Sequence, residues 1–232
     1  MRAGLVVPRT IFQTWRNKTA LPQDVEPYVA RLRDFCIQHG FEHVLVDDDE
    51  MTSFVRDSFP GYLPVYKSLE TVVERTDLWR YLILLRHGGF YLDLDCEITE
   101  AFGRVTDHLD KPLVQVEHDK WLDWARGVCH LPQIGQFFLG FPAGSPILEE
   151  VVAEVVRRLE HRPYRKLGRY QEILFTTGPG AFGEVVCRHR TRVHFFRVNQ
   201  LVVHHTRGNW VGGLNRGPLR WLWRRCSVPY VR

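Results

Sequence analysis

The 232-residue sequence lacks the marks of several protein classes. Its five cysteines are odd in number, lie far apart and form no C-x-x-C pair, so neither a disulfide framework nor a zinc site is predicted. No stretch reaches the roughly 20 apolar residues of a membrane span, and the apolar run at the N-terminus is too short for a signal peptide. Repeats, low-complexity tracts and linkers are also missing. We therefore expect a soluble, folded protein with reduced thiols.

The charge excess is small. Lysine and arginine number 31 and aspartate and glutamate 27, which gives a net charge of +4. This balance suits anionic ligands but is too weak to indicate a nucleic-acid partner. The length and the 44% hydrophobic content allow one domain with a sizeable core.

One stretch, from Glu74 to Glu97, carries most of the information. Residues 68–86 contain no glycine or proline and place apolar residues at helical spacing, which predicts a helix with a buried second half. Gly88 and Gly89 follow and should end the helix. Residues 90–95 then have the composition of a strand.

The predicted strand places two carboxylates together. Side chains two apart on a strand share a face, so Tyr91, Asp93 and Asp95 should line up. Neighbouring carboxylates repel unless a cation compensates them, and Mg²⁺ and Mn²⁺ prefer such oxygen ligands. A bare D-x-D sequence is too short to exclude a strand end whose aspartates meet solvent.

The rest of the chain predicts an α/β domain with a mainly parallel sheet flanked by helices. Ligands of such sheets bind at the carboxyl ends of strands, where Trp15, the acidic residues 47–49 and the D-x-D pair fall. Further strands are predicted at residues 5–7 with 10–15, 41–46, 113–117, 137–141, 193–198 and 201–203, and further helices at 25–38, 51–58, 147–160 and from the turn at 176–180 to about 188. Residues 118–130 are read as a possible acceptor-facing loop.

Six ordered segments resemble one family, the retaining glycosyltransferases with a D-x-D motif that include fungal initiating mannosyltransferases and bacterial capsular sugar transferases. They are PRTIFQTW at 8–15, DDEM at 48–51, RTDLWRY at 75–81 leading to GGFYLDLD at 88–95, FPAGSP at 141–146, TGP at 177–179 and HHTRGNW at 204–210. Four positions depart from the family pattern. These are Phe12, Val46, Gln136 and Asn209.

The resemblance implies a single GT-A domain, residues 1–215, with a basic and aromatic tail at 216–232. That tail is read as packing on the domain rather than as a membrane or nucleic-acid patch. The implied activity is transfer of a hexose from GDP-mannose or a UDP-sugar to a glycan-type or other hydroxyl acceptor, with Mn²⁺ or Mg²⁺ as cofactor. The expected location is the cytoplasm, or the Golgi lumen if an N-terminal anchor has been removed.

The resemblance also implies roles for single residues. Trp15 would stack on the nucleobase, Asp77 would hold ribose or sugar hydroxyls, and Tyr91 would contact the ribose. Asp93 and Asp95 would hold the metal with His205, for which His204 is the second choice. The implied catalytic residues are Asp93, Asp95, Arg80 and Trp210, and the implied donor-binding residues are Gln13, Trp15, Asp48, Asp77, Arg80, Tyr91, Asp93 and Gly178.

Two other functions stay open at this point. A phosphatase of the haloacid dehalogenase type also carries D-x-D at a strand end, although its motif continues to Thr or Val where this chain has Glu97. A catalytically silent nucleotide-sugar-binding protein needs nearly the same residues without the metal. For a transferase, no residue stands out as a covalent nucleophile, which favours front-face attack with the diphosphate helping to take the acceptor proton.

Overall fold

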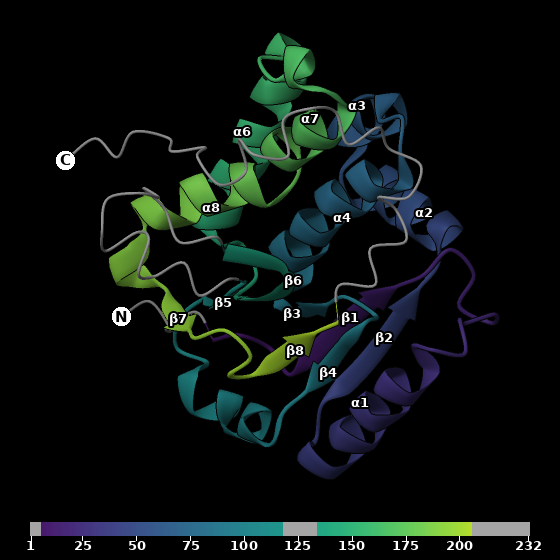
Figure 1. Ribbon diagram of the computed structural model, residues 1–232, viewed down its shortest axis with the longest axis vertical. Helices are drawn as coiled ribbons and strands as arrows, with labels where there is room; N and C mark the ends of the chain where they lie inside the picture. The colour runs from purple at the N-terminus through teal and green to yellow at the C-terminus, as the bar shows by residue number, and fades with distance from the viewer. Residues whose placement is uncertain (1–5, 118–133, 206–232) are drawn as a thin grey trace.

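The computed structural model describes residues 6–117 and 134–205, and it is a layered α/β structure (Figure 1). A six-stranded sheet with the order β2-β1-β3-β6-β5-β7 forms the middle layer. Two short strands, β4 and β8, pair separately. The strands are β1 (Thr10–Thr14), β2 (Glu42–Val46), β3 (Gly89–Leu92), β4 (Cys96–Ile98), β5 (Leu113–Val116), β6 (Ile134–Phe141), β7 (His194–Phe196) and β8 (Val202–His204).

The pairing of the strands confirms a mixed, mainly parallel sheet. β1 runs parallel to both β2 and β3, and β5 runs parallel to β7. β6 is antiparallel to its neighbours β3 and β5. The carboxyl ends of β2, β1 and β3 therefore lie side by side at one edge of the sheet.

Helices cover both faces of the sheet (Figure 1). On one face lie α2 (Asp48–Ser58), α3 (Leu63–Ser68), α4 (Val72–His87), α6 (Pro146–His161), α7 (Arg169–Thr176) and α8 (Pro179–Arg188). On the other face lie α1 (Glu26–His39) and the 3-10 helix η2 (Glu100–His108). Three more 3-10 turns are η1 (Pro60–Tyr62), η3 (Arg165–Leu167) and η4 (Arg190–Arg192).

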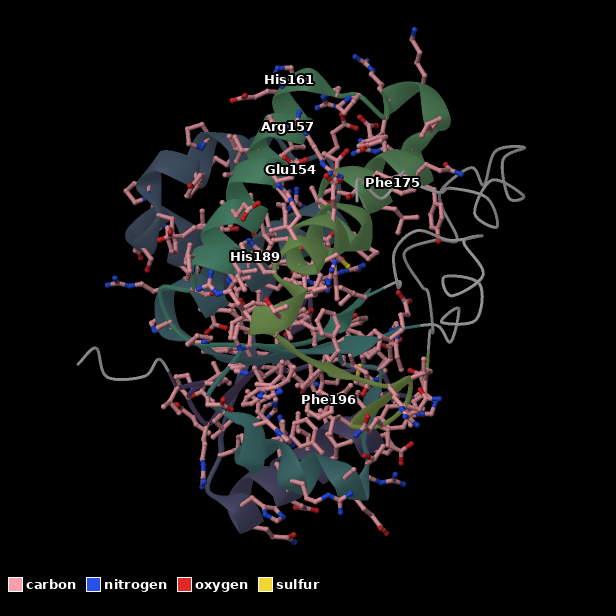
Figure 2. The ribbon with its side chains drawn as sticks, turned by 90° about the vertical axis from the view of Figure 1, so that its left-hand side faces the viewer. Glu154, Arg157, His161, Phe175, His189 and Phe196 are labelled. Carbon is pink, nitrogen blue, oxygen red and sulfur yellow. The ribbon has the colours of Figure 1, made fainter. Side chains whose placement is uncertain are left out.

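Alternation along the strands builds one core on each face. Phe12 and Tyr91 point into the core beneath α4, α6 and α8, whereas their neighbours Ile11 and Phe90 point into the core beneath α1 and η2. Figure 2 shows Phe196 of β7 on this second side, across the sheet from α6. Because both faces are covered, the central strands are almost completely buried.

The helix before the D-x-D sequence begins later than predicted. A capping box formed by Thr71 and Glu74 starts α4 at Val72, instead of near residue 68. α4 ends at His87, as the following glycines predict, because Gly88 adopts a positive φ of 66° that favours glycine. Gly89 also has no room for a side chain, because a Cβ atom there would lie 2.5 Å from the carbonyl oxygen of Thr10.

The other helices from the sequence lie close to their predicted places, whereas α3 and α7 were not predicted. Among the described residues, no helix combines the length and the apolar character that crossing a bilayer requires. The predicted acceptor-facing loop at 118–130 and the tail at 216–232 lie outside the described residues.

Candidate functional site

The D-x-D sequence lies in a tight turn. β3 ends at Leu92, so the prediction that the strand continues to Asp95 is wrong. The main-chain N–H of Asp93 donates to the carbonyl of Phe137, and that of Cys96 donates back to the carbonyl of Asp93, at 3.2 Å. The chain leaves the sheet at this point and turns into β4. The two carboxylates therefore converge through a turn, and not through the alternation of a strand.

The short strand β8 brings a histidine to the two aspartates. In its antiparallel pairing with β4, His204 lies opposite Cys96. Its Nε2 atom is 3.3 Å from Oδ1 of Asp95 and 4.0 Å from Oδ2 of Asp93. The ring stacks on Phe137, with the centroids 4.6 Å apart. One ligand atom from each of the three polar side chains lies within 4.8 Å of the other two.

His205, the first choice from the sequence, faces a different group of residues. Its Nε2 atom lies 3.1 Å from Oε2 of Glu97, and its ring stacks on Tyr28. Only its main-chain N–H approaches the turn, donating to the carbonyl of Asp95 at 3.1 Å. Successive residues of a strand point to opposite sides, which explains why one of the two histidines reaches the aspartates. The structure places the second choice, His204, at the candidate metal group.

A residue that the sequence reading overlooked, Gln115, holds β8 in place. Its side chain is fully buried and donates to the carbonyl of Val202 at 2.6 Å. Its Oε1 atom accepts from the main-chain N–H groups of Leu201 and Val202, at 2.8 and 3.0 Å. A glutamine inside an otherwise apolar strand was the signal that could have found it. These bonds fix the strand that carries His204.

Arg80 joins the aspartate turn to helix α4. Its Nη2 atom lies 3.3 Å from Oδ1 of Asp77 and 3.6 Å from Oδ1 of Asp93, while Nη1 donates to the carbonyl of Gln136. The guanidinium covers the ring of Tyr91, 4.4 Å from its centroid. The Tyr91 hydroxyl donates to Oδ1 of Asp93 at 2.6 Å. A permanent positive charge thus stands beside the carboxylates in a largely buried place.

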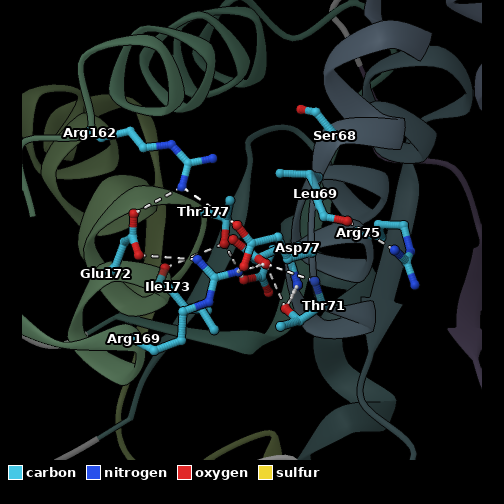
Figure 3. A network of polar contacts seen from close by, with 12 residues as sticks. Ser68, Leu69, Thr71, Arg75, Asp77, Arg162, Arg169, Glu172, Ile173 and Thr177 are labelled. Atoms are coloured by element: carbon cyan, nitrogen blue, oxygen red, sulfur yellow. Dashed lines mark hydrogen bonds and ion pairs between the residues drawn. The ribbon is translucent and has the colours of Figure 1, made fainter. Parts of the chain in front are cut away.

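Asp77 is buried, and both of its carboxylate oxygens contact protein groups. Oδ2 accepts a hydrogen bond of 2.8 Å from the hydroxyl of Thr177, at the end of α7 (Figure 3). Burial raises the pKa of Asp77 to about 6, although Arg80 and the Thr177 hydroxyl oppose the rise. Asp77 is therefore mainly ionised at neutral pH and pairs with Arg80.

His204 is subject to opposing influences. Burial lowers its pKa, but the hydrogen bond to Asp95 and the negative charge of Asp93 outweigh burial, so the pKa lies above its usual value. The Nδ1 atom is buried and has no hydrogen-bond partner among the described residues. The ring thus offers Nε2 toward the carboxylates and keeps its other nitrogen on the protein side.

At the end of β1, Gln13 supports the aspartate turn from below. Its amide Nε2 donates to the carbonyl of Asp93 at 3.3 Å, and its Oε1 accepts from Nε2 of His43 at 3.0 Å. Burial, helped by the charge of Arg33, lowers the pKa of His43 to about 4. This histidine is therefore neutral at pH 7. Gln13 contacts the turn as a support, and His43 was not predicted to take part.

The remaining predicted residues lie around this centre or beyond it. Trp15 is partly buried against the cluster of Val25, Val29 and Leu94. Asp48 stands in the first turn of α2, at the carboxyl end of β2.

Gly178 packs against the backbone of α7, and its N–H donates to the carbonyl of Ile173, which gives it a structural role behind Asp77. Trp210 lies outside the described residues.

Two carboxylates and an imidazole form a suitable ligand set for a divalent cation. Carboxylates suit Mg²⁺ and Mn²⁺, and one imidazole is compatible with a transition metal. The three side chains come from a turn and from a strand fixed by Gln115, so the set is held in place before any ligand arrives. Asp93, Asp95 and His204 could hold such an ion, with Arg80 beside it.

Comparisons with known proteins show which sequences this chain resembles. The family model described as "Glycosyltransferase sugar-binding region containing DXD motif" matches residues 22–115. Inositol phosphoceramide mannosyltransferase 3 of Schizosaccharomyces pombe is 30% identical over 174 residues, which are 75% of this chain and 43% of the relative. The initiation-specific alpha-1,6-mannosyltransferase of Candida albicans is 24% identical over 213 residues, which are 80% of this chain and 54% of the relative. The chain spans about half the length of the curated relatives that it matches.

A solved structure supports the fold alone. The PaToxG glycosyltransferase superposes with a TM-score of 0.54 at 13% identity, over 79% of this chain and 70% of that chain. This likeness confirms the predicted GT-A fold. The D-x-D sequence Asp93-Leu94-Asp95 falls within the residues that the family model matches. The chain is therefore similar, over residues 22–115, to the glycosyltransferases that share this DXD-containing sugar-binding region.

Proposed function

We propose that this chain transfers a hexose from a nucleoside diphosphate sugar, GDP-mannose or a UDP-sugar, to a hydroxyl of a glycan-type or other acceptor. The observation that carries the proposal is the convergence of Asp93, Asp95 and His204 beside the buried Arg80. Such a site suits a diphosphate, because a bound cation and a guanidinium can share its negative charge. The relatives named above, two of them mannosyltransferases, support hexose transfer as the class of reaction.

A divalent cation held by Asp93, Asp95 and His204 would stabilise the negative charge that develops on the departing diphosphate. Arg80 contributes to the same task from the protein. Its guanidinium is fixed by Asp77, the carbonyl of Gln136 and the ring of Tyr91, so it needs little reorganisation when charge develops.

The other residues bind and orient the donor. In the proposal, Asp77 and Tyr91 face the sugar and ribose hydroxyls, and Trp15 stacks on the base. Trp210 closes over the donor and donates its indole N–H to the diphosphate. We further propose that the configuration at the anomeric carbon is retained, by front-face attack in which the diphosphate helps to take the acceptor proton.

Hydrolysis of a nucleotide sugar, measured with Mn²⁺ and with EDTA, tests the proposal. We expect turnover with Mn²⁺, none with EDTA, and none in Asp95→Asn although that variant folds. A phosphatase would spare the nucleotide sugar and cleave a phosphomonoester, and a silent binding protein would turn nothing over. Full activity of Asp95→Asn would contradict the assignment.

The extent of the domain and the compartment belong to the same proposal. We propose that residues 1–215 form the GT-A domain, that residues 216–232 pack on it, and that the enzyme acts in the cytoplasm. A chain ending at residue 215 should unfold cooperatively, and loss of that transition would contradict this division. Recovery of the native protein from a lumenal membrane fraction would contradict the location.

A further inference from the structure

Below the D-x-D turn, two polar side chains lie on the same face of neighbouring strands. β1 and β2 pair in parallel at one end of the sheet, with Ile11 opposite His43 and Gln13 opposite Leu45 (Figure 1). Side chains two apart on a strand share a face, so Gln13 and His43 lie with Ile11 on the face covered by α1. Gln13 is 1% exposed. A polar side chain buried this deeply is expected to have hydrogen-bond partners.

The two partners of Gln13 determine how its amide is oriented. A carbonyl oxygen can only accept, so the amide turns its N–H groups toward the carbonyl of Asp93, at 3.3 Å. The amide oxygen is then left facing Nε2 of His43, at 3.0 Å. Because that oxygen can only accept, His43 is the donor of this second bond.

The charge state of His43 agrees with this assignment. Burial, helped by the charge of Arg33, lowers the pKa of His43 to about 4, so the imidazole is neutral at pH 7. A neutral imidazole carries a hydrogen on one of its two nitrogens. In His43 that nitrogen is Nε2. Without this donor the buried amide oxygen of Gln13 would lose its partner, and the amide would no longer be held toward Asp93.

The carbonyl that Gln13 binds lies in the short link between the two aspartates. It belongs to the peptide bond from Asp93 to Leu94, the first of two that separate Asp93 from Asp95. The same oxygen accepts from the main-chain N–H of Cys96 at 3.2 Å, which closes the turn. Rotation of this peptide unit would move the carboxylate of Asp95 relative to that of Asp93. Gln13 is thus placed to fix how the two carboxylates are spaced.

A second set of contacts holds Asp93 from the other face of the sheet. The hydroxyl of Tyr91 donates to its carboxylate at 2.6 Å, and the guanidinium of Arg80 lies 3.6 Å from it. Tyr91 belongs to the core beneath α4, whereas Gln13 and His43 lie on the face covered by α1. The turn is therefore held by its side chain from one face and by its main chain from the other.

We infer that His43 is a positioning residue for the candidate metal centre, acting through Gln13 to fix the turn that joins the two aspartates. His43 donates to Gln13, and Gln13 donates to the turn, so loss of the first donor loosens the second contact. Outer partners of this kind change metal affinity by about tenfold to a hundredfold. The inference rests on the proposed function, in which Asp93, Asp95 and His204 hold a divalent cation.

Mn²⁺ affinity of the full chain, measured by calorimetry, tests the inference. His43→Leu and His43→Phe both remove the donor to Gln13 and differ in shape, so one folded variant of the two is enough. We expect each to bind Mn²⁺ about tenfold more weakly than the wild type. His43→Gln should return the affinity to near the wild-type value, because its amide N–H can take the place of Nε2–H.

A histidine at the opposite end of the sheet provides the matched control. His194 of β7 is also partly buried, but it bonds to Asp110 at 3.2 Å, far along the sheet order from β1 and β2. His194→Leu should keep the wild-type affinity for Mn²⁺. An equal loss in His194→Leu and in His43→Leu would overturn the inference.

A double-mutant comparison tests whether His43 acts through Gln13. Gln13→Leu should weaken Mn²⁺ binding as much as His43→Leu, and combining the two should add nothing further. Additive losses, or full affinity in Gln13→Leu, would overturn the inference whether or not the His43 variants fold. Circular dichroism establishes which variants are folded.

The wild type separates this inference from the proposed function. If it binds Mn²⁺ and turns over a nucleotide sugar while a folded His43→Leu or His43→Phe keeps full affinity, the role of His43 is wrong and the proposed function stands. If the wild type binds no Mn²⁺, both are wrong.

Discussion

The hydroxyl of Thr177 donates a hydrogen bond of 2.8 Å to Oδ2 of Asp77, across one hundred residues of sequence. Both side chains are buried, and the other oxygen of Asp77 faces Arg80. The start of α7 is also tied to α4 by Arg169, which pairs with Glu74 of α4 and with Glu172 of its own helix. Figure 3 shows Thr177, Asp77 and the Arg169–Glu172 pair together in this one network.

Replacing Thr177 by valine should destabilise the protein in a pH-dependent way. The variant keeps the shape but removes a hydrogen bond to a charged group, which is worth about 1.5 to 3 kcal/mol. Because that bond favours the ionised carboxylate, its loss should raise the pKa of Asp77 above its value of about 6. The cost should therefore be larger at pH 8 than at pH 5, as urea unfolding at the two pH values would measure.

The direction of this pH dependence follows because folding changes the pKa of Asp77 and is therefore linked to proton binding. The folded-state pKa of Asp77 lies above the ordinary aspartate value of 3.8, so the contribution of Asp77 to stability is full below about pH 4 and is lost as the pH rises through 6. In Thr177→Val the folded-state pKa of Asp77 is raised further, so the loss of stability continues to a higher pH than in the wild type. Thr176→Val is the matched control, because the Thr176 hydroxyl is buried without a partner among the described residues. An equal cost in both variants would contradict the role of the Thr177 bond.

Two glycines of the α7 to α8 region should respond oppositely to alanine. At Gly178 a Cβ atom would lie 2.8 Å from the Cα of Leu174, so Gly178→Ala should cost about 1 to 3 kcal/mol through overpacking. At Gly183, inside α8, a Cβ atom would meet nothing within 4 Å. Gly183→Ala should therefore stabilise the helix by about 0.5 to 1 kcal/mol. Urea unfolding measures both, and a stabilising Gly178→Ala would contradict the packing described.

Gln115 should be important for stability because its buried side chain holds β8 in place. Gln115→Leu leaves the N–H groups of Leu201 and Val202 without their buried acceptor, and we expect a loss of about 2 to 4 kcal/mol in the free energy of unfolding. The same substitution at the exposed Gln38 of α1 should change it by less than about 0.5 kcal/mol. Equal effects at the two positions would show that the Gln115 bonds do not anchor β8.

The limits of a helix were predicted well where its sequence carries one clear local signal. The apolar spacing of α6, the glycines after α4 and the acidic turn before α2 gave those elements close to their observed limits. The sequence did not reveal α7, which is only eight residues long and begins without a side-chain cap. It also misplaced the strand at Asp93 and Asp95, because strand composition continues past the point where the chain turns away from the sheet.

The sequence predicted which residues form the candidate site better than it predicted how they come together. Helical spacing places Asp77 and Arg80 on one face of α4, beside Tyr91 and Asp93, whereas Asp95 joins them through the turn that follows β3. The choice between His204 and His205 depends on how β8 pairs with β4, a contact between segments about a hundred residues apart. No local pattern encodes that register, and the Gln115 bonds that support it are also long-range.

Mn²⁺ affinity of His204→Ala and of His205→Ala, measured side by side by calorimetry, tests the central claim most directly. His204 lies with Asp93 and Asp95, whereas His205 faces Glu97 and Tyr28. Loss of a ligand should weaken binding by roughly tenfold or more, so we predict this for His204→Ala and near wild-type affinity for His205→Ala. Unchanged Mn²⁺ affinity in His204→Ala, or its loss in His205→Ala alone, would contradict the site described.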